Sequence, residues 1–127
     1  MKNFIRIFFI STILIFGLES CGKDSKNSAT AKVKVEQNGL PKSGVTVYMF
    51  GNRKGPDSSF FTPFHADKQS VTENDGIAIF ELKETFDLEL INDQTTLYFG
   101  VFEGDVVLGR SAVTIKKGET KTVNINL

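Results

Sequence analysis

Apolar and polar residues alternate along most of the chain beyond Ala31, and this period of two constrains the fold more than any other feature. Successive side chains of a β-strand point to opposite faces of its sheet, so the alternation predicts strands with one buried and one exposed face. The segments with this pattern are 32–36, 45–50, 77–82, 86–90, 95–103, 106–115 and 123–127.

Turn residues separate these predicted strands. Asn38–Gly44 contains two glycines and a proline, and glycine also marks Asn74–Gly76, Gly104–Asp105 and Lys116–Gly118. Glycine supplies positive φ angles and proline fixes φ, as tight turns require. Seven short strands joined by turns predict an all-β fold, namely an antiparallel seven-stranded sandwich that forms one domain over residues 31–127.

The N-terminus has a different character. Two basic residues, Lys2 and Arg6, precede an apolar run that extends from Ile7 to Leu18. At about 1.5 Å per helical residue this run covers roughly 18 Å, which is well short of a hydrocarbon core of about 30 Å. A short apolar run behind a positive head is typical of a secretory signal peptide, which we place at residues 1–20. A buried helix of the folded domain is the alternative interpretation.

The sequence LESC at Leu18–Cys21 contains the one cysteine of the chain and resembles the lipobox of bacterial lipoproteins. Glu19 departs from the commonest lipobox pattern at its most variable position. The resemblance implies diacylglycerol on the Cys21 sulfur, cleavage before Cys21 and acylation of the new N-terminus. Two or three acyl chains hold a soluble domain on a bilayer, whereas one chain binds only marginally. A free buried thiol is the alternative.

Residues 21–30 are mostly small and polar, and such a composition predicts a flexible tether after the lipidated Cys21. Lys23 and Asp24 resemble the tether signal that sends lipoproteins of Bacteroidota-type bacteria to the cell surface. We therefore expect a lipid anchor in the outer membrane, on its periplasmic face or at the cell surface, with the cell surface favoured.

The charge balance bears on the class of partner. The whole chain has 15 basic and 15 acidic side chains, and removal of residues 1–20 leaves 13 and 14. A field this weak does not steer a protein toward nucleic acid. The expected contacts are the membrane, through the lipid anchor at Cys21, and an envelope protein or glycan.

Two turn-and-strand pieces within 31–82 resemble a known family. Gly39–Pro41 stands before the strand Gly44–Val47, and Thr72–Gly76 stands before Ile77–Phe80. This order is similar to the transthyretin-like, carboxypeptidase-regulatory-like sandwich found in many bacterial envelope proteins. The resemblance covers about the first half of the mature chain. Because members of this family generally serve in such roles, the resemblance implies an accessory, spacer or binding module and not a catalyst.

One connection is longer than a sandwich needs. About twenty residues, 51–70, separate two predicted strands, and they include Phe60, Phe61, Phe64 and His65. Loops longer than about 12–15 residues are usually functional or disordered, and disordered segments are poor in aromatic residues. We interpret these four residues as a candidate binding site. The alternative is that the rings fold back and plug one end of the sandwich, together with a short extra strand.

The sequence offers few residues from which a catalytic site or a metal site could be formed. His65 is the one histidine, and the chain has no Gly-x-Ser-x-Gly turn around which a nucleophile could be built. The several His or Cys ligands of a zinc site are missing. Glu73, Asn74 and Asp75 could offer oxygen atoms to calcium, but their spacing is that of a turn and not of an EF-hand loop. We expect no enzyme activity, no metal and no cofactor.

Related sandwich domains of bacterial surface adhesins contain an internal Lys–Asn isopeptide bond, and this chain has residues that could form one. The candidates are Lys32 or Lys34 with Asn124 or Asn126, beside Glu81. Alternation argues against the bond, because the apolar residues between these candidates would face the core and leave the candidates in solvent.

The predicted function is that of a membrane-anchored, non-catalytic envelope lipoprotein. It would act as a binding or accessory module for a protein or a glycan. The alternative is a structural spacer lipoprotein that stabilises an outer-membrane assembly.

Overall fold

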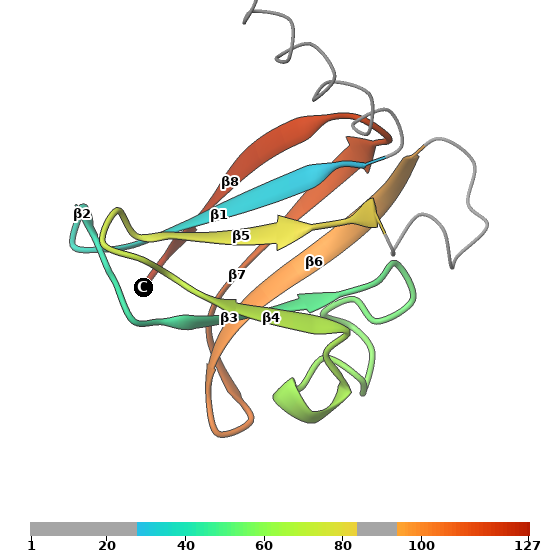
Figure 1. Cartoon of the computed structure of the whole chain (residues 1–127). Helices are drawn as coiled ribbons and strands as arrows, with labels where there is room; N and C mark the ends of the chain where they lie inside the picture. Colours follow the sequence, from blue (N-terminus) through green and yellow to red (C-terminus); the bar gives the residue numbers. More distant parts are fainter. Residues whose placement is uncertain (1–27, 84–93) are drawn as a thin grey trace, which may run out of the picture.

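The computed structural model describes residues 28–83 and 94–127, which form a sandwich of two four-stranded sheets (Figure 1). The expected all-β sandwich is confirmed. The strands are β1 (Thr30–Gln37), β2 (Leu40–Pro41), β3 (Thr46–Phe50), β4 (Lys68–Val71), β5 (Ile77–Glu81), β6 (Gln94–Glu103), β7 (Val106–Lys116) and β8 (Thr120–Asn126). A 3-10 turn, η2 (Pro63–His65), lies in the connection from β3 to β4.

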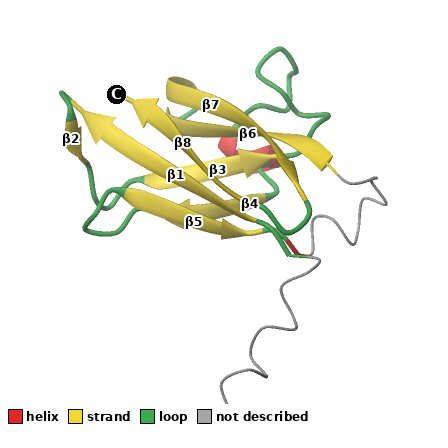
Figure 2. Ribbon diagram, turned by 90° about the horizontal axis from the view of Figure 1, so that it is seen from above, coloured by secondary structure: helices red, strands yellow, loops and turns green. Residues whose placement is uncertain are grey.

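The two sheets have different pairing patterns. In the first sheet β1 pairs with β2, β5 and β8, and in the second sheet the order is β4-β3-β6-β7. Figure 2, which looks from above, shows the strands of the two layers crossing over one another. The long β6–β7 hairpin has a register shift between Val101 and Phe102, beyond which Val106 and Val107 lie near its tip.

The structure corrects the predicted strand count and direction. It adds β2 and β4 to the predicted strands, while the predicted strand at 86–90 lies outside the described residues. The pairing of β1 with β8 is parallel, with Val33 opposite Val123, although all pairings were expected to be antiparallel. The turn at Lys116–Gly118 carries the chain from one sheet to the other and does not close a hairpin ladder. Alternation predicts which face of a strand is buried, but it does not predict the strand's partner.

The core lies between the sheets and consists of the side chains that alternation predicted to face inward. Val33 and Val35 of β1, Leu97 of β6 and Ile125 of β8 are fully buried. Burying each of these side chains contributes roughly 1.5–3 kcal/mol relative to leaving it exposed. The inward faces therefore account for the stability of the sandwich.

Gly76 and Thr72 make close contacts between the two sheets at one end of the sandwich. Gly76 has φ +78°, and a Cβ at this position would lie 2.9 Å from Pro41 Cβ and 3.0 Å from the Val35 carbonyl oxygen. The buried Thr72 donates its hydroxyl to the Lys42 carbonyl (2.7 Å) and accepts from the Val45 N–H (2.9 Å). The turn residues singled out in the sequence thus join the two sheets at this end.

The outer face of the first sheet is mostly polar, although Ile79 of β5, which lies opposite Lys32, is 46% exposed on it. Lys34 lies opposite Asn124 in register, and its Nζ is 3.5 Å from Glu36 Oε2. Lys32 and Lys34 lie on the side opposite the buried valines, as alternation predicted, so neither occupies the dry site that an isopeptide bond requires.

The predicted signal peptide, the predicted lipidation residue Cys21 and most of the predicted tether lie outside the described residues. In the part of the chain that the structure does describe, no helix has the length and apolar character to cross a bilayer.

Candidate functional site

The outer face of the second sheet is aromatic. Tyr48 and Phe50 of β3 and Tyr98 and Phe102 of β6 point away from the core, because their neighbours along each strand face inward. We call these four residues the outer aromatic face. Phe50 is fully buried even though it faces away from the core. Something must therefore cover it, and the cover is the 51–67 connection between β3 and β4.

Phe61 is the side chain that holds this connection against the sheet. Its exposed fraction is 6%, and its ring centroid lies 4.5 Å from that of Phe50 and 5.4 Å from that of Phe102. Gly100 leaves room for both rings, since a Cβ there would lie 3.1 Å from Phe61 Cζ and 2.7 Å from Phe102 Cε2. Phe61 therefore packs on the sandwich. For this ring, the alternative interpretation of the connection, in which the rings fold back onto the sandwich, describes the structure.

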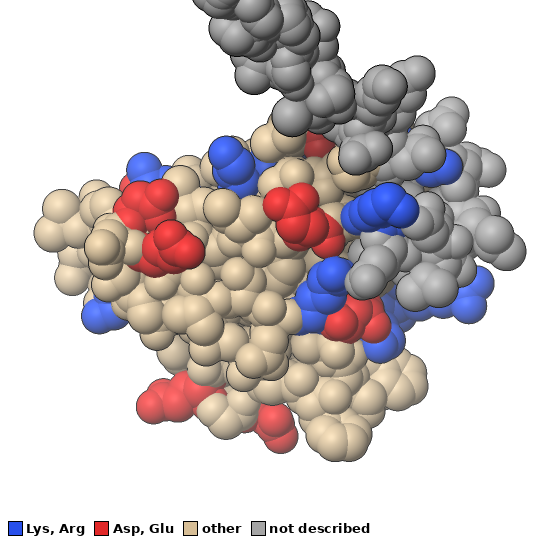
Figure 3. Space-filling view, viewed as in Figure 1, with Lys and Arg blue, Asp and Glu red and all other residues tan. Residues whose placement is uncertain are grey.

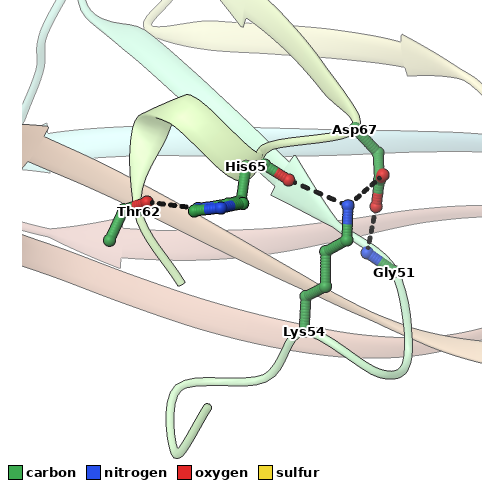
Figure 4. Close-up of polar contacts among 5 residues, drawn as sticks. All are labelled: Gly51, Lys54, Thr62, His65 and Asp67. Atoms are coloured by element: carbon green, nitrogen blue, oxygen red, sulfur yellow. Dashed lines mark hydrogen bonds and ion pairs between the residues drawn. The ribbon is translucent and has the colours of Figure 1, made fainter. Parts of the chain in front are cut away.

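A polar network fixes the two ends of the connection to each other (Figure 4). Asp67 accepts a hydrogen bond from the Gly51 N–H (2.7 Å) through Oδ2 and pairs with Lys54 Nζ (2.8 Å) through Oδ1. The same ammonium group donates to the His65 carbonyl oxygen (3.0 Å). The network joins the start of the connection to η2 and to Asp67, which directly precedes β4.

Phe60, Phe64 and His65 form a second set of rings that faces solvent, and we call it the ring cluster. The ring of His65 contacts the edges or faces of Phe60 and Phe64, with centroid distances of 5.0 and 5.1 Å and interplanar angles of 75° and 88°. His65 Nδ1 lies 3.0 Å from Thr62 Oγ1. Phe64 is 89% exposed and Phe60 is 47% exposed. Edge-to-face contacts hold the rings in place without removing them from water.

The structure thus divides the four predicted binding residues. Phe60, Phe64 and His65 come together at the surface, whereas Phe61 points to the opposite side and packs on the sheet. Binding by the three exposed residues stays a prediction. Cys21 lies outside the described residues, so lipidation also stays a prediction.

His65 and Asp75, which the sequence offers for catalysis or metal binding, and the nearby Asp67 all have local structural contacts. The His65 ring contacts Thr62 and two phenylalanines, and Asp67 is engaged by Lys54. Asp75 accepts a hydrogen bond from the Ile77 N–H (3.0 Å) within its turn. Within residues 28–83 and 94–127, no group of three or more His, Cys, Asp or Glu side chains is placed to hold a metal ion.

Sequence reasoning missed a depression beside the connection. It has a volume of about 630 Å³ and lies between the loop residues Gly55–Ser58 and the strand residues Tyr98 and Arg110–Ala112. Its two sides are far apart in the sequence, and turn composition does not show over which face a loop folds. The outward position of Tyr98 and Arg110 in their strands was the signal available in the sequence.

Charges are mixed on the surface in view. Figure 3, in the orientation of Figure 1, shows basic and acidic side chains interspersed, with no broad patch of one sign on its described surface. This face therefore offers no stripe of positive charge of the kind that binds a nucleic acid backbone.

No protein-family model matches the chain, and a sequence comparison with curated proteins finds no match. Solved structures with a weak likeness include the Bacillus anthracis TIE protein, with TM-score 0.46 and 10% identity over 79% of this chain and 16% of that chain. GBS52, the minor pilin of Streptococcus agalactiae, has TM-score 0.46 and 14% identity over 76% of this chain and 49% of that chain. Catechol 1,2-dioxygenase from Pseudomonas arvilla C-1 has TM-score 0.39 and 12% identity over 84% of this chain and 54% of that chain. The chain spans about half or less of each, and no conclusion about activity or partners follows from likenesses this weak.

Proposed function

We propose that this protein is a lipid-anchored, non-catalytic binding or accessory module of a bacterial cell envelope. In this proposal its ring cluster takes up an envelope protein or a glycan. The observation that carries the proposal is the exposure of Phe64 and Phe60, at 89% and 47%, on rings that are held in a fixed arrangement through His65. Aromatic rings that are already ordered give large contact area on binding and lose little conformational entropy.

The anchor is the second part of the proposal. The lipobox-like Leu18–Cys21 and the polar tether behind it support an outer-membrane protein held by acyl chains, with the cell surface favoured by Lys23 and Asp24. The resemblance of the first half of the mature chain to transthyretin-like sandwiches supports an accessory role. Growth of the producing cells with a palmitate analogue tests the anchor. The proposal expects label on the wild-type chain and none on Cys21→Ala, and label that persists on that variant contradicts it.

Ring substitutions test the binding role. We expect Phe60→Ser and Phe64→Ser to abolish capture of the partner on a glycan array or in affinity capture with purified envelope proteins, while the melting temperature stays unchanged. Val71→Ser is a matched control, because Val71 is 51% exposed on β4 and outside the ring cluster. Binding that survives both ring substitutions, or falls equally with Val71→Ser, contradicts the role of the ring cluster.

A structural spacer that stabilises an outer-membrane assembly is the second candidate. It follows the alternative interpretation of the connection, in which the rings pack on the sandwich, and Phe61 is the one of the four candidate residues that packs in this way. The spacer predicts that ring-cluster substitutions leave glycan and protein capture unaffected, and that loss of the whole chain alters the integrity of the assembly.

A further inference from the structure

The depression beside the 51–67 connection has strand residues as its floor and loop residues as its wall. Tyr98 lies opposite Ala112 in the β6–β7 register, and Gly100 lies opposite Arg110, so Tyr98, Ala112 and Arg110 share the outer face of the second sheet. The wall is Gly55–Ser58. A volume of about 630 Å³ falls within the range of roughly 300–1,000 Å³ that is usual for ligand pockets.

Gly55 sets the position of the wall against the floor. A Cβ at this position would lie 3.2 Å from Cε2 and Cζ of the Tyr98 ring, so a larger residue would need the ring or the loop to move by a few tenths of an ångström. Ser58 ties the wall internally, because its hydroxyl donates to the Gly55 carbonyl (2.9 Å) and accepts from the Phe60 N–H (3.2 Å). The wall therefore has contacts of its own, both within the loop and with the Tyr98 ring of the floor.

Three polar side chains in the depression have no polar partner among the described residues. The Arg110 guanidinium, the Tyr98 hydroxyl and the Asp57 carboxylate form no hydrogen bond or ion pair with any described residue. Arg110 and Asp57 line the same depression without pairing with each other. An arginine, a tyrosine and a carboxylate that line one depression are then available to a ligand.

The chemistry of these groups selects the ligand. A guanidinium matches a carboxylate through two parallel N–H donors. An ionised carboxylate only accepts, so Asp57 favours hydroxyl donors and repels a second negative charge. A tyrosine ring offers a flat apolar surface that ends in a hydroxyl. A compact ring that carries one carboxylate and several hydroxyl groups fits this combination better than a ring with several anionic groups or an apolar ring.

We propose that this depression binds a carboxylate-bearing sugar residue of an acidic glycan. Arg110 holds the carboxylate, the Tyr98 side chain supports the sugar ring, and Asp57 accepts hydrogen bonds from the sugar hydroxyls. This site is separate from the ring cluster and does not depend on it, because none of Phe60, Phe64 and His65 lines the depression.

Calorimetric titration of the full chain in detergent, with trigalacturonate as the probe, tests the proposal. We expect saturable binding that is at least about tenfold weaker for the neutral galactotriose, and Arg110→Gln should weaken binding of trigalacturonate by roughly ten- to a hundredfold. Tyr98→Phe keeps the aromatic ring but removes the hydroxyl, and it should weaken the binding of trigalacturonate by about two- to tenfold. Arg53→Gln is the matched control, because Arg53 is an exposed arginine of the same connection that does not line the depression.

The remaining outcomes separate this site from its competitors. Absence of saturable binding overturns the proposal, as does equal loss with Arg53→Gln or binding of galactotriose as tight as that of trigalacturonate. Tighter binding of triglutamate would assign the site to an acidic peptide and overturn the sugar assignment. Phe64→Ser should leave trigalacturonate binding within twofold of the wild-type value, so failure of the ring-cluster function and failure of this site are distinguishable.

Discussion

The same alternation predicts the outer faces of the two sheets, yet in the structure the two faces differ in their residue types and in whether a loop covers them. The outer face of the first sheet carries Lys32, Lys34 and Glu36 of β1, which remain in contact with solvent. The outer face of the second sheet carries aromatic residues and is covered by the 51–67 connection, so that Phe50 is fully buried. Outward aromatic residues therefore indicate a covered face, whereas outward charged residues indicate a free one.

This difference locates the candidate functions. The cover places one ring inward, Phe61, and two rings outward, Phe60 and Phe64, within five positions of the sequence. The inward ring and the Asp67 network hold the cover in place. The outward rings and the neighbouring depression are then presented on a fixed support, which is the arrangement that a binding site requires.

The largest expected effect is that of Phe61→Ala. Removing this buried ring should lower the free energy of unfolding by about 3 kcal/mol, because a large aromatic side chain leaves a cavity against Phe50 and Phe102. Urea unfolding measures the loss. Phe64→Ala is the control, and this exposed ring should change stability by no more than about 0.5 kcal/mol. Equal losses in the two variants would contradict the division of the rings.

Gly100→Ala tests the same packing from the side of the sheet. The new Cβ would lie 2.7 Å from Phe102 and 3.1 Å from Phe61, so both rings must move. We expect a loss of about 1–2 kcal/mol, which is the usual effect of overpacking where flexible rings can shift in part. Near-ultraviolet circular dichroism should report the displaced rings. An unchanged spectrum together with unchanged stability would show that the connection does not lie on Gly100.

Asp67→Ala tests the polar network of the connection. The variant loses an acceptor for the Gly51 N–H and a partner for Lys54, and both charged side chains are partly exposed. We expect a loss of about 1 kcal/mol, most of it from the backbone hydrogen bond, because ion pairs at the surface contribute little. Hydrogen exchange should become faster at the Gly51 amide. Protection that persists there would show that this bond does not hold the connection.

Lys34→Gln on the first sheet should have the smallest effect. Its ion pair with Glu36 has an N–O distance of 3.5 Å and side chains that are 37% and 23% exposed, so stability should change by less than about 0.5 kcal/mol. Thermal unfolding in low and high salt measures the change. A loss as large as that of Asp67→Ala would mean that the outer face of the first sheet is not the free surface that the comparison describes.

The sequence was informative where the alternation of apolar and polar residues alone determines which side chains are buried. Val33, Val35 and Leu97 are buried as alternation predicted, and the glycine turn at Gly76 lies where its φ of +78° is required. The parallel pairing of β1 with β8 could not be predicted, because alternation contains no information about strand partners.

The candidate site was predicted only in part for a related reason. Composition showed that the connection is aromatic, but it could not show that Phe61 faces the sheet while Phe64 faces solvent. The inward position of Phe61 depends on contacts with β6, which is distant in the sequence and whose Gly100 leaves room for the Phe61 ring. The depression beside Tyr98 likewise depends on where the connection lies against β6 and was missed entirely.

Photo-crosslinking in the producing cells tests most directly whether the covered face is the functional one. A benzophenone side chain at position 64 keeps an aromatic ring in the ring cluster, and one at position 79 probes the free face, where Ile79 is 46% exposed. We predict a discrete adduct from position 64 that disappears when Phe60→Ser is added, and no adduct from position 79. Equal adducts from both positions, or an adduct from position 79 alone, would contradict the account.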